Sequence, residues 1–416
     1  MFALPLKICY HLYIKPTLGD DAMDIKKLAI LGEAAKYDIC SSSASTGRKI
    51  AKADMGNTVP SGICHSFTPD GRCVSLLKVL MTNECEKDCS YCPNRAQRDV
   101  PRTTFAPDEL SKLFIDMYER NYIEGLFLSS GVRHGTPNSI EDMIKTVEIL
   151  RLRYRFGGYI HLKMLPGISE QYIAQAARLA DRVSLNLEAP NSDRLKLLSK
   201  SKNYEKDLLL PIKNISKAVE ENPGTTHTTQ FIVGAAQESD QEILTTVNDL
   251  YASYNLKRAY FSAFSPVYDT PLENVAPAPK IRENRLYQSD FLMRFYDFRF
   301  KDFIFDGTGN LDTQLDPKLM YAVRNPQLFP VEVNRASYEQ LLRVPGIGPK
   351  SARKILELRR QYRIKSPLEL KNMGISLKRS VKFITISGKC YDSSRWLMDP
   401  VKYEYEQLNL FKEVSL

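Results

Sequence analysis

The sequence predicts an α/β fold in which a parallel sheet is wound into a partial (β/α)6 barrel, followed by a small all-α domain. Two observations carry this prediction. Short apolar runs alternate with amphipathic stretches through the middle of the chain, and a basic helical segment follows a Pro-rich stretch. With 416 residues, the chain is long enough for two or three domains.

Six short apolar runs have the length and composition of buried strands. They cover residues 73–81, 125–130, 159–165, 182–188, 228–234 and 258–264. Amphipathic helical stretches lie between them at 107–120, 139–154 and 168–180. Because each strand is followed by a helix, the strands are expected to be parallel and to carry function at their carboxyl ends.

Composition also suggests where domains begin and end. A helix-like run opens at Met23, so residues 1–22 are either an N-terminal extension or part of the fold. A Pro-rich stretch at 265–279 ends the strand-helix alternation. The expected segments are an N-terminal helix and loop (23–72), the barrel (73–279), a helical connector (280–333), a nucleic-acid-binding domain (334–400) and a tail (401–416).

The connector is expected to begin with a long helix at about 280–300. Tyr287, Phe291 and Phe295 recur along it at helical spacing. Such a stripe is more often core than cofactor contact, so we expect these three rings to be buried.

The formal net charge of +9 is concentrated near the C-terminus. Residues 331–400 contain fifteen Lys and Arg against six Asp and Glu, whereas the rest of the chain is balanced. A polyanion is the natural partner of such a segment. The alternative is a basic face that is merely solvated.

Eight cysteines at irregular spacing, without a secretory signal, favour a reducing compartment and metal or redox use of some thiols. We therefore expect a cytoplasmic protein. No apolar run approaches the length of a membrane span, so no membrane partner is expected. Cys40, Cys64 and Cys73 could hold an auxiliary cluster, although their spacing follows no known ligand pattern.

The strongest motif is a CxxxCxxC array formed by Cys85, Cys89 and Cys92, directly after the first predicted strand, with Tyr91 before the last thiol. A 4Fe-4S cluster usually takes four cysteines, so a three-cysteine loop leaves one iron open to a small-molecule ligand. A structural zinc loop would need a fourth Cys or His nearby, and none is adjacent in the sequence.

At this array the sequence resembles the radical S-adenosylmethionine (SAM) superfamily, over about residues 73–270. The resemblance implies a radical SAM partial (β/α)6 barrel with two cofactors, a 4Fe-4S cluster and SAM. In the family, the open iron is chelated by the amino and carboxylate groups of SAM, and reductive cleavage yields a 5′-deoxyadenosyl radical. It also implies an electron donor such as flavodoxin or ferredoxin.

The resemblance assigns five further positions to SAM binding: Gly131, Glu188, Arg194, Ile232 and Gly234. Gly131 ends the second strand, where relatives bind the SAM amino group. Glu188 matches a polar residue on the ribose, and Arg194 a guanidinium that pairs with the carboxylate. Ile232 and Gly234 lie where the fifth strand packs along adenine.

These positions also have simpler interpretations. Ser129 and Ser130 replace the glycines that usually precede Gly131. Arg194 would be explained by a surface ion pair. Glu188 would be explained as an acidic residue that precedes a helix and interacts favourably with its N-terminus. Strand packing alone would explain Ile232.

His161 and Lys163 alternate on the third predicted strand and so point to the same face. If that face is the barrel interior, either residue would meet substrate or SAM. A lone strand-borne histidine is more often satisfied structurally. No catalytic residue is assigned.

Residues 334–360 place a helix, the hairpin VPGIGPK and a second helix in sequence, which resembles a helix-hairpin-helix (HhH) motif. Gly346 and Gly348 permit a close backbone approach, so N–H groups of the hairpin and the next helix can face a phosphate. Lys350, Ser351 and Arg353 can add side-chain contacts. The alternative is a helical protein-interaction module.

A second, altered copy of the motif is expected in LKNMGISLKRSVKFI, residues 370–384. Gly374 and Ile375 form its hairpin, whereas Ser376 replaces the second glycine. Paired HhH units in repair proteins bind duplex DNA. The serine at position 376 is therefore expected to weaken duplex binding by the second unit.

Both modules in this order, from about Met23 to the C-terminus, resemble a bacterial family of radical SAM proteins described as acting in DNA modification or repair. The resemblance implies an enzyme that modifies or repairs a nucleotide of DNA, with DNA favoured over RNA. The substrate base would need to leave its stack to reach the barrel. The alternatives are a tRNA- or RNA-modifying radical SAM enzyme and a non-catalytic iron-sulfur DNA-binding protein.

Overall fold

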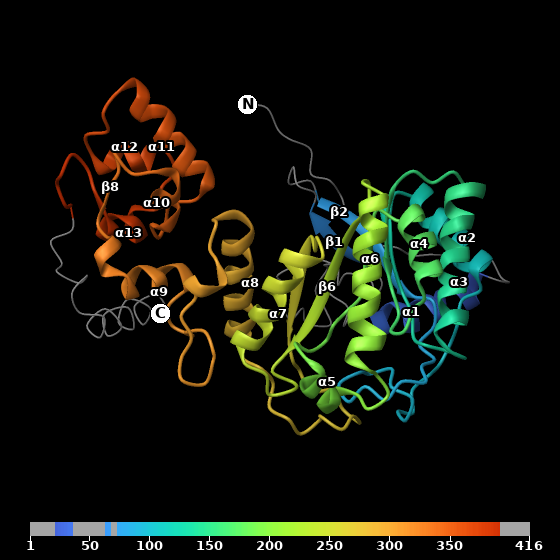
Figure 1. The fold of residues 1–416 in the computed structure, drawn as a ribbon. Coiled ribbons are helices and arrows are strands. Elements are labelled where there is room, and N and C mark those ends of the chain that lie inside the picture. The colour runs from blue at the N-terminus through green and yellow to red at the C-terminus, as the bar shows by residue number, and fades with distance from the viewer. Residues whose placement is uncertain (1–20, 36–62, 68–72, 392–416) are drawn as a thin grey trace, which may run out of the picture.

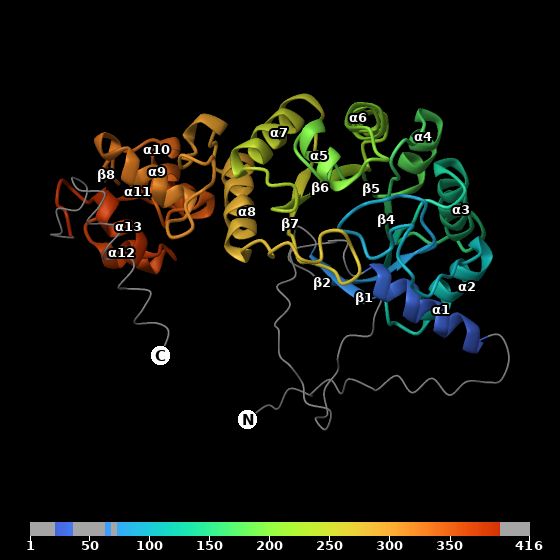
Figure 2. The same ribbon diagram turned by 90° about the horizontal axis from the view of Figure 1, so that it is seen from below.

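The computed structural model describes residues 21–35, 63–67 and 73–391. A curled, seven-stranded sheet forms the larger part, and a small helical module follows it (Figure 1). Seen from below, the strands follow an arc whose convex side is covered by helices, and the module lies beyond α8 (Figure 2). The expected α/β half-barrel with a C-terminal helical domain is confirmed.

The strands lie in the sheet in the order in which they occur in the chain, β1 to β7. Strands β2 to β7 are all parallel. Each of these six coincides with one of the six apolar runs. The bounds are β1 (Ile63–Phe67), β2 (Cys73–Leu80), β3 (Gly125–Ser129), β4 (Tyr159–Lys163), β5 (Arg182–Ser184), β6 (Thr226–Val233) and β7 (Arg258–Ala263).

Strand β1 was not expected, because residues 23–72 were assigned to a helix and a loop. It pairs antiparallel with β2, from Ile63 opposite Leu77 to Phe67 opposite Cys73. The segment ICHSF has no regular alternation, so its pairing comes from the neighbouring edge of the sheet rather than from a pattern of its own.

Helices connect the parallel strands and bury their apolar faces against the sheet. Helix α7 shows how local sequence sets a boundary, because Ser239 and Glu242 form a reciprocal capping box at its start. The remaining helices of this part are α1 (Asp21–Ala34), α2 (Pro107–Glu119), α3 (Thr136–Glu148), η2 (Ile149–Arg153), α4 (Glu170–Leu179), α5 (Ser192–Leu198), η3 (Tyr204–Leu209) and α6 (Leu210–Glu221); α7 itself is Asp240–Ser253.

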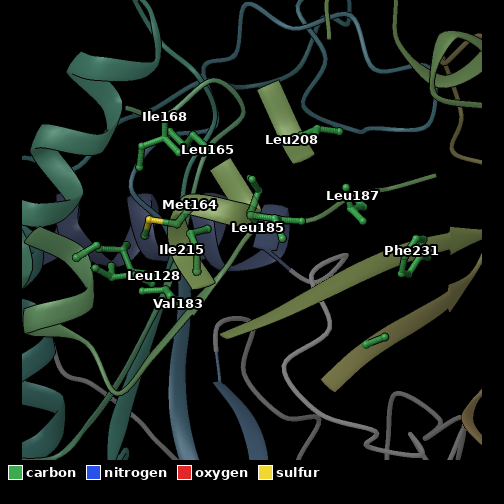
Figure 3. Close-up of a cluster of buried hydrophobic side chains, with 14 of the residues drawn as sticks. Leu128, Met164, Leu165, Ile168, Val183, Leu185, Leu187, Leu208, Ile215 and Phe231 are labelled. Atoms are coloured by element: carbon green, nitrogen blue, oxygen red, sulfur yellow. The ribbon is translucent and has the colours of Figure 1, made fainter. Parts of the chain in front are cut away.

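The main hydrophobic core lies between the sheet and these helices. In Figure 3, Leu128, Val183 and Leu185 from the strand regions meet Ile215 of α6 and Met164. All five are at most 4% exposed. This packing fixes the helices on the convex side, while the alternate side chains of the strands face the concave side of the sheet.

Helix α8 (Lys280–Phe295) follows β7 and closes the arc. The expectation that its three aromatic rings are core is correct only in part. The hydroxyl of Tyr287 exchanges hydrogen bonds with the backbone of Phe261, but Phe291 and Phe295 are 48% and 50% exposed. Their rings contact each other in a tilted arrangement, with centroids 4.8 Å apart.

The C-terminal module has a separate hydrophobic core that runs from Leu315 to Ile386. It therefore includes α9, which the sequence analysis assigned to the connector. The module is helical except for β8 and β9, which form a short parallel pair and correct the all-α expectation. Its elements are α9 (Pro317–Arg324), η5 (Pro326–Leu328), β8 (Val331–Glu332), α10 (Tyr338–Arg343), α11 (Pro349–Gln361), α12 (Pro367–Asn372), α13 (Leu377–Ser380), η6 (Val381–Phe383) and β9 (Ile384–Thr385). The short helix η4 (Phe300–Asp302) precedes the module and packs against the main core.

Three of the sequence expectations fall on residues that the structure does not describe. These are the N-terminal extension up to residue 20, Cys40 and the tail beyond residue 391. Among the helices that are described, none is long and apolar enough to cross a membrane.

Candidate active site and nucleic-acid-binding module

The CxxxCxxC array lies on a loop that leaves the carboxyl end of β2. The loop is tied to the end of β3 by two backbone hydrogen bonds, from Gly131 to Thr82 (2.7 Å) and from Glu86 to Val132 (2.8 Å). The guanidinium of Arg102 donates to four carbonyl groups of the same loop. A loop without regular secondary structure is thereby held in one conformation.

A cavity of about 540 Å³ opens at the carboxyl ends of the parallel strands, where a barrel is expected to carry function. Cys85, Cys89 and Cys92 all line it. The structure thus brings the three predicted ligands together on one wall of the cavity.

The three thiols suit an iron-sulfur cluster better than a single ion. Within the described ranges, no three His, Cys, Asp or Glu side chains converge so as to hold one metal ion. A cubane cluster does not require such convergence, because each thiolate binds a different iron. Burial, followed by the charge of Cys89, raises the pKa of the Cys92 thiol to about 12, so a thiolate here needs a bound cation.

Three buried side chains lie directly beside the cysteines. The Nζ atom of Lys202 is 3.7 Å from Oε1 of Glu188, and the two side chains are 6% and 10% exposed. Tyr91 lies close to Glu188, and burial together with that carboxylate raises the pKa of Tyr91. Burial alone would lower the pKa of Lys202, but the charges of Cys89 and Glu188 outweigh it and raise the pKa.

Lys202 was missed by the sequence analysis. It lies in the irregular segment SKSKNY, and neither spacing nor periodicity connects it with the cysteines. In the fold, Asp88 of the cluster loop binds the residues just before Lys202. A buried cation beside a thiolate and a carboxylate can hold an anionic part of a ligand.

Of the five predicted SAM-binding positions, Gly131, Glu188 and Ile232 line the cavity. Gly131 has a further reason to be glycine, because a Cβ atom there would collide with the carbonyl oxygen of Glu84. Glu188 has φ +67°, a backbone conformation that favours glycine, so its carboxylate is held in the site at the expense of local strain.

Arg194 and Gly234 occupy other surroundings. Arg194 donates to both carboxylate oxygens of Glu242, at 2.9 and 3.1 Å, which agrees with the ion-pair interpretation. Gly234 has φ +92°, and a Cβ atom there would lie 2.7 Å from Cβ of Ala278. The ion pair accounts for Arg194, and backbone geometry with close packing accounts for Gly234.

His161 and Lys163 both face the barrel interior, as their alternation predicted. Nε2 of His161 is 2.7 Å from the hydroxyl of Ser184, and its ring stacks on Phe127 at 4.3 Å. Burial lowers the pKa of His161 well below its usual value, so the ring is neutral and structurally satisfied. Lys163 lines the cavity, as does Cys64 of the suggested auxiliary set.

The first HhH unit consists of α10, the hairpin 344–348 and α11. Gly346 has φ +85°, and a Cβ atom there would approach the carbonyl oxygen of Ser376 to 2.8 Å. A Cβ atom on Gly348 would lie 3.0 Å from the hydroxyl of Tyr296. Both glycines therefore allow the hairpin to pack closely against other parts of the protein. The sequence had suggested a different reason for them, the close approach of a phosphate.

The start of α11 is the most accessible part of this unit. Its N-cap, Gly348, offers no side-chain cap to the first N–H groups of the helix. Lys350 and Arg353 are exposed and Ser351 is half-buried. Uncapped N–H groups next to two cations form an arrangement that suits a phosphate.

The segment expected to be a second, altered HhH unit contains two short helices joined by a turn. Helices α12 and α13 flank Gly374, which has φ +82° and open space where a Cβ atom would lie. Arg379 of α13 pairs with Asp316 at the start of α9. The two hairpins contact each other through Gly346 and Ser376.

Comparison with protein families gives two matches. Residues 79–250 match the radical SAM superfamily, and residues 329–374 match the helix-hairpin-helix motif. The first match contains the cysteine array, and the second contains both hairpin glycines. No curated protein matches the sequence.

Several solved structures resemble the larger domain. They include HydG, a maturase of the [FeFe]-hydrogenase (11% identity, 51% of this chain and 48% of that chain, TM-score 0.42). Methylornithine synthase shows 14% identity over 51% of this chain and 60% of that chain, with a TM-score of 0.41. A radical SAM methyltransferase from Sphaerobacter thermophilus shows 18% identity over 54% and 68%, with a TM-score of 0.42. The chain thus spans about half the length of HydG and 60% of methylornithine synthase.

Proposed function

Because this chain belongs to the radical SAM superfamily and carries a C-terminal helix-hairpin-helix motif, we propose that it modifies or repairs a nucleotide of DNA. Superfamily membership makes it an enzyme whose cofactors are a 4Fe-4S cluster and SAM. The observation that supports the nucleic-acid substrate is the coincidence of the HhH hairpin with the entire excess of positive charge, in residues 331–400.

In this proposal, Cys85, Cys89 and Cys92 hold the cluster. A cluster held there would supply the reducing chemistry for cleavage of SAM, and the enzyme would need an electron donor such as flavodoxin or ferredoxin. Gly131, Glu188 and Ile232 line the space beside the thiols, where SAM would lie. Lys202, buried between Cys89 and Glu188, provides a fixed cation for the carboxylate of SAM.

The C-terminal module would bind the phosphate backbone and hold the substrate near the barrel. The N–H groups at the start of α11, with Lys350, Ser351 and Arg353, supply contacts that give affinity and position but carry little sequence information. A nucleotide held in a duplex could reach the cavity only after it is extruded from the stack.

The experiment that tests this function uses anaerobic holoenzyme, SAM and a reductant, incubated separately with genomic DNA and with total tRNA. Digestion to nucleosides and mass spectrometry would reveal the altered product. We expect a changed deoxynucleoside together with 5′-deoxyadenosine, and neither with the Cys85→Ala/Cys89→Ala/Cys92→Ala variant.

The Cys390→Ala variant is the matched control, because Cys390 is exposed in the C-terminal module, away from the cavity. A change confined to tRNA would replace DNA by RNA as the substrate. Formation of 5′-deoxyadenosine without any change in either nucleic acid would contradict the nucleic-acid assignment altogether.

A further inference from the structure

One lysine of the cavity has no charge partner among the residues that the structure describes. Five lysines line the cavity: Lys78, Lys87, Lys163, Lys202 and Lys280. Three of them have carboxylate partners, since Lys87 lies 3.6 Å from Glu86, Lys202 lies 3.7 Å from Glu188 and Lys280 lies 3.7 Å from Glu283.

Lys78 differs from these three. Its residue is only 9% exposed, and the remaining surface opens into the cavity. Among the residues that the structure describes, no hydrogen-bond acceptor or carboxylate is paired with it. While the cavity holds water, that water solvates the ammonium group. A ligand that fills the cavity removes this water and must replace it with an acceptor, because an unpaired buried charge is costly.

The position of Lys78 separates it from the cluster wall. It lies within β2, opposite Phe127 of β3, and Phe127 is in turn opposite His161 of β4. Lys78 therefore shares a level with the stacked Phe127–His161 pair, two residues before Leu80, the last residue of β2. The cluster loop begins only beyond Leu80, so Lys78 belongs to the floor of the cavity.

The rest of the floor is polar as well. Asn186, Gln230 and Ser262 line the cavity from the three strands or strand ends opposite β2. Amide and hydroxyl groups at the wall of a cavity suit a ligand that carries many heteroatoms.

We propose that Lys78 is a substrate-binding residue whose ammonium group pairs with an anionic group of the substrate. This inference rests on the proposed function, which makes that group a phosphate of the nucleotide. The ammonium group has three donors and no acceptor, so it can bind a phosphate as a point charge.

The test is equilibrium dialysis of the full-length, SAM-loaded holoenzyme against three probes: inorganic phosphate, deoxynucleoside 5′-monophosphates and the corresponding nucleosides. For the monophosphates, Lys78→Met should weaken binding by about tenfold or more, which is the usual range for loss of a charged hydrogen bond. Lys78→Arg should retain most of the affinity, and nucleoside binding should not change. Lys145→Met, an exposed lysine of α3, is the matched control.

Cluster content and the circular-dichroism spectrum of Lys78→Met should match those of the wild type, which shows that the variant is folded. Equal binding of the monophosphates by the wild type and Lys78→Met would overturn the proposal. So would an equal loss for nucleosides, or a loss of SAM affinity in place of phosphate affinity. In another outcome, the affinity for inorganic phosphate depends on Lys78 while the monophosphates bind no more tightly than inorganic phosphate. That result would support the anion site and contradict a nucleotide substrate.

Discussion

Asp88, which lies between Cys85 and Cys89 on the cluster loop, accepts a hydrogen bond of 2.5 Å from the hydroxyl of Ser199. The same carboxylate accepts from the hydroxyl of Ser201 (2.7 Å) and the backbone N–H of Lys200 (3.0 Å). Burial would raise the pKa of Asp88, but these hydrogen bonds outweigh it and lower the pKa to about 2. Asp88 thereby joins the cysteine array to the segment that delivers Lys202.

We expect Asp88→Ala to reduce the iron content of reconstituted protein, because the cluster loop loses its hydrogen bonds to Ser199, Lys200 and Ser201. Loss of hydrogen bonds to a charged acceptor typically costs about 1.5–3 kcal/mol, which corresponds to a lower midpoint of thermal unfolding. Iron analysis and calorimetry are the measurements. Asp193→Ala is the control, since its pair with Lys196 is fully at the surface. Equal iron content in both variants would show that the loop holds its shape without Asp88.

The cysteine array gives the second prediction. Replacing Cys85, Cys89 or Cys92 singly by Ala should abolish both the cluster and SAM cleavage, whereas Cys390→Ala should retain both. In the wild type, SAM should also perturb the electron-spin resonance of the reduced cluster, because three thiolates leave one iron open. A triple variant with unchanged iron and spectrum, or a signal insensitive to saturating SAM, would contradict this cluster site.

The parts of the fold that could be predicted are those specified by local pattern. Six apolar runs became six parallel strands because a strand buried on both faces needs a continuous apolar segment. The cysteine spacing likewise lies within one loop and was readable from the sequence alone. Strand β1 was missed because ICHSF has no such run and pairs only through the edge of β2.

The parts that could not be predicted depend on contacts between distant segments. Lys202 lies beside the cysteines because the segment before it is bound to the cluster loop. Asp88 accepts from Ser199, 111 residues away along the chain, and the N–H of Ser90 donates to the carbonyl oxygen of Leu198. Gly346 was expected to make room for phosphate, yet the space beside it is occupied by Ser376 of the second hairpin. Phe291 and Phe295 have core-like spacing, but the face of α8 on which they lie is left largely uncovered.

The third prediction concerns pH and Lys318, which is buried beneath the first hairpin. Its ammonium group donates to the carbonyl oxygen of Ile347 (2.6 Å) and lies 4.6 Å from the centroid of the Tyr296 ring. Burial, chiefly, lowers the pKa of Lys318 to about 7. Between this pKa and the normal value near 10.5, the unfolded chain binds more protons than the folded one.

The stability of the C-terminal module should therefore rise as the pH increases above about 7, by at most about 1.4 kcal/mol per pH unit for one proton. Urea unfolding of the full chain at pH 6, 7.5 and 9, followed by circular dichroism, measures this. The free energy of unfolding of the wild type should rise relative to that of Lys318→Met as the pH increases. Lys301→Met, which changes an exposed lysine, should follow the wild type. A pH-independent difference for Lys318→Met would mean that Lys318 stays charged in the folded module.

The last prediction concerns Lys350 and Arg353, which lie exposed on the first turn of α11 beside its uncapped N–H groups. The Lys350→Ala/Arg353→Ala variant should bind duplex DNA more weakly, because two cationic contacts to phosphate are lost. Each phosphate contact releases counterions, so the slope of log affinity against log salt should flatten by roughly 1 to 2 units.

Valine at Gly346 is a poorer test, since it would clash with Ser376 and disturb the hairpin. The matched control is Lys213→Ala/Lys217→Ala, which removes the same charge from the exposed face of α6. Formation of 5′-deoxyadenosine without substrate should survive in both variants, because neither alters the cavity. If the salt slopes of the two variants coincide with that of the wild type, the hairpin acts as a protein-interaction module and the DNA assignment loses its main support.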